Sequence, residues 1–364
     1  MSLHCCAKDI DLKRSLFTTS LVVISLLGLS ACSSSSPDST ATAPSTTSAA
    51  PDTAAPNSSA DTPGPTAVPD GMGSPGLADG VFPRTVGHFA GSTDIPAEPK
   101  RVVVLATGQL DSVLTLDVLP VGVTYAGGAE LVPEYLSRSF PQYSEQMASF
   151  VDVGNRQDVN FEALAAIQPD LILGNNTASE EDYPLLSAIA PTVLTEGVGI
   201  NWKQDFLLIA AALGRTEQAQ QYLDDFLDDA HELGDTVGSD SPTVSFVRFT
   251  ADLARVYGVP SFAGFIAWDA GLGRPESQQF DKVARDFSEE EIQLADADWV
   301  FVSNQQTGTP GSNAETFTSN PLWTSMSAAT ENHIVAVEDD PWFLNAGPTA
   351  ATLVLNVLTD TLTQ

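Results

Sequence analysis

Residues 101–105 constrain the fold more than any other part of the sequence. Their sequence, RVVVL, contains three successive valines without a polar interruption. Such a run is typical of a strand that is covered on both faces, as in a parallel sheet. Further strands are predicted at 120–123, 171–174 and 192–194, and helices at 110–119, 161–167 and 183–189. This alternation predicts an α/β fold, preceded by a small hairpin formed by residues 84–88 and 92–95.

Two helices are expected in the middle of the chain, at 202–213 and 216–233. The apolar residues of the second helix recur at spacings of three, four and seven, which places them on one stripe. Thr216 is expected to cap its N-terminus, and Gly214 and Gly234 are expected to end the two helices. At 1.5 Å per residue the second helix is about 25 Å long, which is enough to cross between two lobes.

The α/β pattern begins again after residue 238. Strands are predicted at 244–249, 299–302 and 333–337, a capping box at 288–291 predicts a short helix, and a final helix is predicted at 347–362. The segment 82–364 is longer than the length above which a chain usually folds into more than one hydrophobic core. We therefore expect an N-terminal α/β lobe at 81–200, connecting helices at 201–234 and a C-terminal α/β lobe at 235–364.

The N-terminus has the pattern of a secretory signal peptide, residues 1–31. Basic residues precede an apolar run at 16–29, which ends in small residues and is shorter than the roughly 20 residues that span a bilayer. Cys32 follows directly, and this arrangement resembles the bacterial lipobox, in which that cysteine is lipidated. The alternative is an ordinary secreted protein with an unrelated cysteine. The prediction is a lipoprotein anchored to the extracytoplasmic face of the cell membrane.

Composition limits the rest of the chain. Residues 32–80 are rich in Ser, Thr, Ala and Pro, and predict a disordered tether between the lipid and the folded part. Cys5 and Cys6 lie in the leader, so no disulfide is expected and a packed core must stabilise the protein. The precursor has a formal net charge of −32, which excludes nucleic acid as a partner. An anionic ligand would need several of the few arginines gathered at one place.

Several motifs together resemble one family. They are IPAEPKRVVVL at 95–105, LD at 110–111, PVGV at 120–123, VG at 153–154, NFEALAAIQPDLIL at 160–173, IAPTV at 189–193, Trp202 with ALG at 212–214, LADAD at 294–298, NPLW at 320–323, and Trp342 with GPTAA at 347–351. In this order they resemble the substrate-binding lipoproteins of ABC importers for ferric siderophores, haem and cobalamin, here of actinobacterial type.

The resemblance implies the class III periplasmic-binding-protein fold over about residues 100–364. In this fold two Rossmann-like lobes are joined by a single long helix, and the ligand lies in the cleft between them. It further implies a monomer that delivers a ferric siderophore to an ABC permease in the membrane. Iron would be bound indirectly, already chelated, and the only covalent group expected is the lipid.

Ligand contacts are expected beyond the C-terminal ends of the strands. Arg248 interrupts an apolar strand at the point where it should enter the cleft, and family members often place an arginine there; the alternative is a surface ion pair with Asp252. The resemblance places a cleft aromatic at Trp342, which would stack on planar siderophore groups; the alternative is core packing. The remaining candidates are Arg255, Tyr257, Tyr125, Trp268, Arg156 and Thr107.

Two glutamates are candidates for another role. Glu162 and Glu290 lie at the starts of matching helices, where family members present one carboxylate per lobe to arginines of the permease. The alternative is simple helix capping, because negative charge is favoured at helix N-termini.

The sequence also bears on functions other than siderophore binding. The chain lacks the glycine-rich and nucleophile-elbow motifs of common enzymes, and its Asp-Ala-Asp turn at 296–298 has a structural pattern, so no enzyme is expected. His88, His231 and His333 are too scattered for a direct metal site. Haem remains open, because Tyr125 or Tyr257 could ligate its iron, as do cobalamin and a cell-envelope scaffold without a role in transport.

Overall fold

The computed structural model describes residues 64–126, 130–197, 199–306 and 311–364, without the side chains of Thr107, Ala178 and Asp240. The expected signal peptide, Cys32 and most of the tether lie outside these residues. Within the described ranges, no helix is both long and apolar enough to cross a membrane.

The N-terminal lobe is built on a six-stranded sheet with the order β6-β5-β4-β3-β7-β8. Neighbouring strands are parallel except at the edge, where β6 runs antiparallel to β5. The central strand β3 is fully buried, as its valines predict. The strands are β3 (Val102–Val104), β4 (Gly122–Tyr125), β5 (Val151–Asn155), β6 (Asp158–Val159), β7 (Leu171–Asn175) and β8 (Thr192–Thr195).

Helices cover both faces of this sheet. Alternate residues of the central strands face different clusters, so that Val103 packs with α4 and α6 whereas Val102 and Val104 pack with α1 and α7. The helices are α1 (Thr107–Thr115), α2 (Glu134–Ser139), α3 (Ser144–Met147), α4 (Phe161–Ile167), α5 (Asn176–Ser179) and α6 (Tyr183–Ile189). Helix α1 begins and ends earlier than the helix predicted at 110–119. It ends at Thr115 because Asp117 adopts a left-handed conformation with a φ of 55°.

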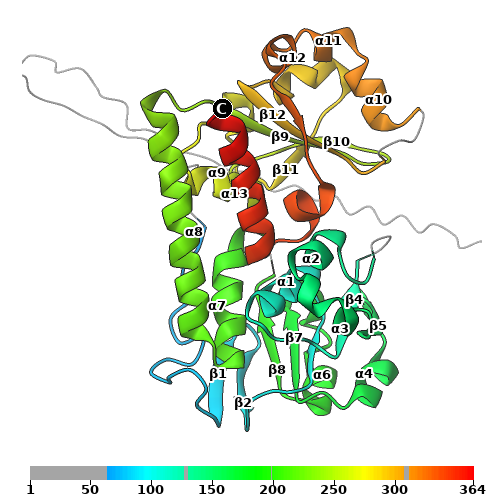
Figure 1. Cartoon of the computed structure of the whole chain (residues 1–364). Coiled ribbons are helices and arrows are strands. Elements are labelled where there is room, and N and C mark those ends of the chain that lie inside the picture. Colours follow the sequence, from blue (N-terminus) through cyan, green and yellow to red (C-terminus); the bar gives the residue numbers. More distant parts are fainter. Residues whose placement is uncertain (1–63, 127–129, 198, 307–310) are drawn as a thin grey trace, which may run out of the picture. The chain divides into compact units, whose positions relative to one another are not determined.

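The connecting region consists of α7 (Trp202–Leu213) and α8 (Thr216–Val237), which confirms two lobes joined by a long helix. In Figure 1, α8 runs along one side of the molecule, beside the C-terminal helix α13 (Pro348–Leu362). With 22 residues, α8 is about 33 Å long.

Helix α8 begins at residue 216 as expected, but its expected cap and its expected C-terminal end were wrong. Thr216 is its first helical residue and not its cap; the carboxylate of Asp79 accepts hydrogen bonds from the backbone N–H groups of Thr216 and Glu217 at 2.7 and 2.8 Å. Gly234 does not end the helix. A Cβ there would lie 2.8 Å from the carbonyl oxygen of Ala270, so this glycine allows close packing instead.

The C-terminal lobe contains a five-stranded mixed sheet with the order β11-β10-β9-β12-β13. Strands β9, β12 and β13 are parallel, whereas β10 and β11 form an antiparallel extension that the sequence did not reveal. The strands are β9 (Val244–Phe249), β10 (Ala254–Tyr257), β11 (Ala284–Asp286), β12 (Trp299–Asn304) and β13 (Ile334–Ala336).

Different helices cover the two faces of the C-terminal sheet. One face packs on α9 (Phe262–Asp269) and α13, and the other on the short helices η5 (Glu289–Ala295), α10 (Asn313–Thr318), α11 (Pro321–Thr324) and α12 (Ser327–Glu331). The capping box predicted at Ser288 is confirmed, with the Glu291 side chain returning to the backbone of Ser288.

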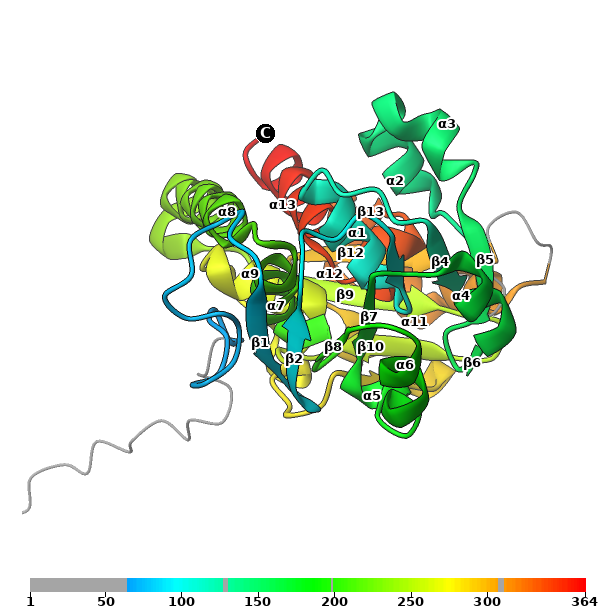
Figure 2. The same cartoon turned by 90° about the horizontal axis from the view of Figure 1, so that it is seen from below.

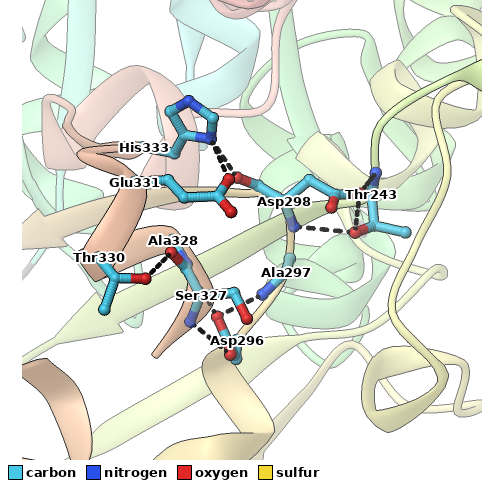
Figure 3. A network of polar contacts seen from close by, with 9 residues as sticks. All are labelled: Thr243, Asp296, Ala297, Asp298, Ser327, Ala328, Thr330, Glu331 and His333. Atoms are coloured by element: carbon cyan, nitrogen blue, oxygen red, sulfur yellow. Dashed lines mark hydrogen bonds and ion pairs between the residues drawn. The ribbon is translucent and has the colours of Figure 1, made fainter. Parts of the chain in front are cut away.

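The Asp-Ala-Asp turn is structural, as predicted. Asp296 accepts from the N–H groups of Ser327 and Ala328 at the start of α12, and Asp298 accepts from the N–H and hydroxyl of Thr243 (Figure 3). These bonds hold the start of β12 against β9 and α12. The hydrogen bonds from Thr243 lower the pKa of Asp298.

The folded region begins before residue 81, which corrects the expected end of the tether. Gly73 exchanges backbone hydrogen bonds with Gly87, and Gly80 donates to the carbonyl of Gly214. With the cap from Asp79, these bonds fix the last part of the expected tether to the lobe. The following hairpin, β1 (Arg84–His88) and β2 (Gly91–Ile95), lies beside β8 (Figure 2).

Candidate functional site

A cavity of about 680 Å³ lies between the two sheets. Its N-terminal wall comes from the start of α1, the β5–β6 turn, the ends of β7 and β8, and α7. Its C-terminal wall comes from β9, β10, β11, the first turn of α9 and the helical turn η6 (Asp340–Leu344). The cavity is therefore located where ligands of α/β sheets are expected.

Arg248 lines the cavity, as predicted from its place in β9. Its partner is Asp339 and not Asp252: Nε and Nη2 each donate to a carboxylate oxygen of Asp339 at 2.7 Å. The hydroxyl of Ser303 donates to the same carboxylate at 2.7 Å. Burial disfavours the charge on Arg248, but the hydrogen bond and the charge of Asp339 raise its pKa overall. The guanidinium is thus held rigidly at the C-terminal wall.

Arg255 and Arg156 also line the cavity. Arg255 forms an ion pair with Asp286 of the neighbouring strand β11, at 2.8 Å. Arg156 lies exposed in the β5–β6 turn, and it has no ion-pair partner within the described part of the chain. Three of the few arginines are thus gathered here, on both lobes.

The two aromatic candidates line the cavity in different ways. Tyr257 packs against Phe343 with a ring separation of 4.7 Å. Trp342 is only 3% exposed, and its ring stacks on Phe301 at 5.3 Å and meets Phe246 edge-on. Core packing, the alternative considered for Trp342, therefore describes most of its ring, and a ligand would reach only its margin.

Two of the remaining candidates, Tyr125 and Trp268, do not line the cavity. Tyr125 ends β4 and pairs with Asn155, one residue short of Arg156. Trp268 lies in the last turn of α9, and it is half-buried. Thr107 begins α1, and its neighbours Ala106 and Gly108 line the cavity, but its own side chain is outside the description.

Sequence reasoning missed three polar residues in the wall formed by α1 and α7. Gln109 is 4% exposed, and its Nε2 donates to the carbonyl of Gly174 at 2.6 Å. Gln109 Oε1 and Trp202 Nε1 are buried without a hydrogen-bond partner among the described residues. Asp205 accepts from the N–H groups of Glu196 and Gly197. The available signal was that Asp205 is the only acidic residue of the helix 202–213.

Comparison with known proteins identifies the family. The model of a periplasmic binding protein family matches residues 102–341. The chain belongs to this family. The fold is accordingly the class III periplasmic-binding-protein fold that the sequence motifs implied.

The relatives of this periplasmic binding protein include several iron-uptake proteins. The probable siderophore-binding lipoprotein YfiY of Bacillus subtilis is 34% identical over 75% of this chain and 86% of its own length. The Fe(3+)-citrate-binding protein YfmC of the same organism is 24% identical over 73% of this chain and 82% of its own. The crystal structure of Staphylococcus aureus SirA complexed with staphyloferrin B superposes with a TM-score of 0.67 at 27% identity, covering 76% and 98% of the two chains.

The two candidate docking glutamates of this periplasmic binding protein are exposed. Glu162 lies in the first turn of α4, whose cap is the Asn160 side chain, and Glu290 lies in the first turn of η5, whose cap is Ser288. Since other residues cap both helices, neither glutamate is needed as the cap. Docking to a permease stays a prediction.

The potential metal-ligating side chains of the described residues are scattered. Within the described ranges, no group of three or more His, Cys, Asp or Glu side chains is arranged to hold a metal ion. Of the two tyrosines considered for haem, only Tyr257 lines the cavity, and it is packed on Phe343. The wall offers hydrogen-bond donors and acceptors, which suit a metal that arrives already chelated.

Proposed function

We propose that this protein captures a ferric siderophore outside the cytoplasm and delivers it to an ABC importer. The observation that carries the proposal is the cavity between the lobes, lined by Arg156, Arg248 and Arg255 with Tyr257 and Phe343. Guanidinium groups donate paired hydrogen bonds to the carboxylate, hydroxamate or phenolate oxygens around ferric iron. Siderophore and ferric-citrate binding by the relatives supports the same ligand class.

The proposed activity is binding without bond chemistry. A siderophore already saturates its iron, so the protein needs no metal ligand of its own. The residues that line the cavity supply charge, hydrogen bonds and apolar contact. Membership of a family of binding proteins supports this assignment.

Delivery requires that the protein stay at the membrane and meet a permease. We propose that Cys32 carries the lipid and that Glu162 and Glu290 contact the permease. Radiolabelled palmitate should enter the parent protein and not a Cys32→Ala variant. The double variant Glu162→Ala with Glu290→Ala should bind ligand normally but abolish uptake by cells, and normal uptake would refute the docking role.

Ligand binding is tested by titrating tryptophan fluorescence with a panel of ferric siderophores, haem and cobalamin. Arg248→Ala should weaken binding of the preferred ferric siderophore by about 10- to 100-fold, because one charge-assisted contact contributes about 1.5–3 kcal/mol. Arg285→Ala is the matched control, since Arg285 is exposed and paired with Glu291 outside the cavity lining. Equal affinity in all three proteins would refute the site, and failure of every ferric siderophore to bind would refute the function.

A further inference from the structure

The charges at the cavity are nearly balanced before any ligand binds. The cations are Arg156, Arg248 and Arg255. Arg248 is already neutralised by Asp339, and Arg255 by Asp286, at 2.7 and 2.8 Å. A ligand that carries several negative charges would have to displace these carboxylates or lie beside them. The whole precursor, at −32, adds further repulsion.

A carboxylate without a cation faces the same cavity. Asp205, in the first turn of α7, accepts one backbone N–H on each oxygen, from Glu196 at 3.0 Å and from Gly197 at 2.8 Å. The side chain of Thr195 adds a third hydrogen bond. A carboxylate has about four lone-pair sites, so that of Asp205 keeps acceptor capacity. No lysine, arginine or histidine in the described part of the chain forms an ion pair with Asp205.

The same wall holds a second unused acceptor. Gln109 lines the cavity. Its Oε1 is buried and has no hydrogen-bond partner among the described residues. A buried acceptor without a partner costs about 1–3 kcal/mol, so a donor brought by a ligand would be favourable. The wall of α1 and α7 is thus rich in acceptors, whereas the arginines Arg248 and Arg255 lie on the opposite wall, on β9 and β10.

We infer that the cavity selects a ferric chelate of low net charge that presents a protonated amine to Asp205. This inference rests on the proposed function and narrows its ligand class. The iron-binding oxygens face the paired arginines, and the ammonium group, with three donors, lies against the acceptors of α1 and α7. Ferric chelates with several negative charges are disfavoured.

The ionisation of Asp205 makes this recognition depend on pH. Burial raises its pKa to about 6, the hydrogen bonds from the N–H groups of Gly197 and Glu196 and from the Thr195 side chain oppose the rise, and the charge of Glu196 adds to it. The Glu196 carboxylate accepts from Gln204 Nε2 at 3.1 Å. The other titratable or charged groups that line the cavity are Arg156, Arg248, Arg255, Tyr257 and Asp286. Affinity for an ammonium group should therefore increase from pH 5 to pH 7.5, as Asp205 ionises.

Three ferric probes test the inference by tryptophan fluorescence. Ferrioxamine B carries a pendant ammonium on a neutral trihydroxamate chelate, its N-acetylated form lacks that charge, and a ferric tris-catecholate is triply negative. At pH 7.5 the parent should bind ferrioxamine B about tenfold more tightly than the acetylated form, and the catecholate most weakly. This preference should nearly vanish at pH 5.

Variants separate recognition from folding. Asp205→Asn should lose about tenfold in affinity for ferrioxamine B at pH 7.5 and leave the acetylated probe unchanged, whereas Asp228→Asn, on the exposed face of α8, should change neither. Equal losses for both trihydroxamates, or tightest binding of the catecholate, would overturn the inference and leave the proposed function intact. Binding of none of the three probes would overturn the inference, and the wider siderophore panel then decides the proposed function separately.

Discussion

His88 makes the stability of the N-terminal lobe sensitive to acid. Its ring is 3% exposed, and Nδ1 accepts from the N–H groups of Ala90 and Leu194 at 3.2 and 3.4 Å. Nε2 lies 2.9 Å from the hydroxyl of Thr93, which itself donates to the carbonyl of Thr192. The ring is therefore neutral with its proton on Nε2, and a second proton on Nδ1 would break the bonds to the backbone.

The size of the effect follows from the pKa. Burial lowers the pKa of His88 from 6.5 to about 4. Since the unfolded chain then binds more protons, the free energy of unfolding falls as the pH drops from about 6.5 to about 4. The full shift would remove about 2 kcal/mol at pH 5 by linkage. Allowing for solvent screening, we expect about 1–2 kcal/mol.

Urea unfolding at pH 7.5 and pH 5 measures this loss in the parent and in His88→Gln. The variant should be less stable than the parent at pH 7.5, and its free energy of unfolding should fall by about 1–2 kcal/mol less between the two pH values. His231→Gln, at an exposed histidine of α8, is the matched control. Because other titrating groups contribute equally to both proteins, parallel profiles of parent and His88→Gln would refute the reasoning.

Three further substitutions test the structure. Asp111→Ala should lower the free energy of unfolding by about 2–4 kcal/mol in urea titrations, because this fully buried carboxylate caps the start of α13 and accepts from a buried tyrosine hydroxyl; a loss below about 1 kcal/mol would contradict this role. Lys203→Ala should cost about 3–5 kcal/mol by the same measurement, since Asp269 would be left buried without its cation, and restoration of stability by adding Asp269→Asn is expected. Gly197→Ala should weaken ligand binding in fluorescence titrations, because Gly197 lines the cavity with a φ of +87° and a Cβ would lie 2.3 Å from Asn175; unchanged affinity would show that this loop adapts.

The sequence predicted those helices and strands that are marked by a regular spacing of apolar residues and by capping residues close to their ends. The helices α4, α6 and α7 and the strand β9 begin and end where their apolar spacing and caps indicate. The long helix α8 was also predicted, but its N-terminal cap and its C-terminal end were not. Its cap comes from Asp79, more than 130 residues away, and Gly234 is explained only by the neighbouring backbone of Ala270. No local pattern contains such contacts.

The candidate site divides in the same way. Arg248 was predicted because a charge in an apolar strand must lie at an end or an opening. Arg255 and Tyr257 were also candidates, but the strand β10 that positions them was not predicted. Trp342 lines the cavity. Its burial on Phe301 was not predicted, because Phe301 belongs to β12, which is distant in sequence. Asp205 was missed because it acts through contacts outside its own helix: its carboxylate accepts hydrogen bonds from the N–H groups of Glu196 and Gly197, in the loop after β8.

The sequence alone determined the α/β class, the division into two lobes, the connecting helices and the family, because these depend on hydrophobic periodicity and on motifs within short segments. Only the tertiary structure decided that Arg248 pairs with Asp339, that Trp342 packs into the core, and that Asp205 faces the cavity without a cation. The physical reason is that the charge and exposure of a side chain depend on neighbours from other elements, and those neighbours are set by how the sheets and helices pack.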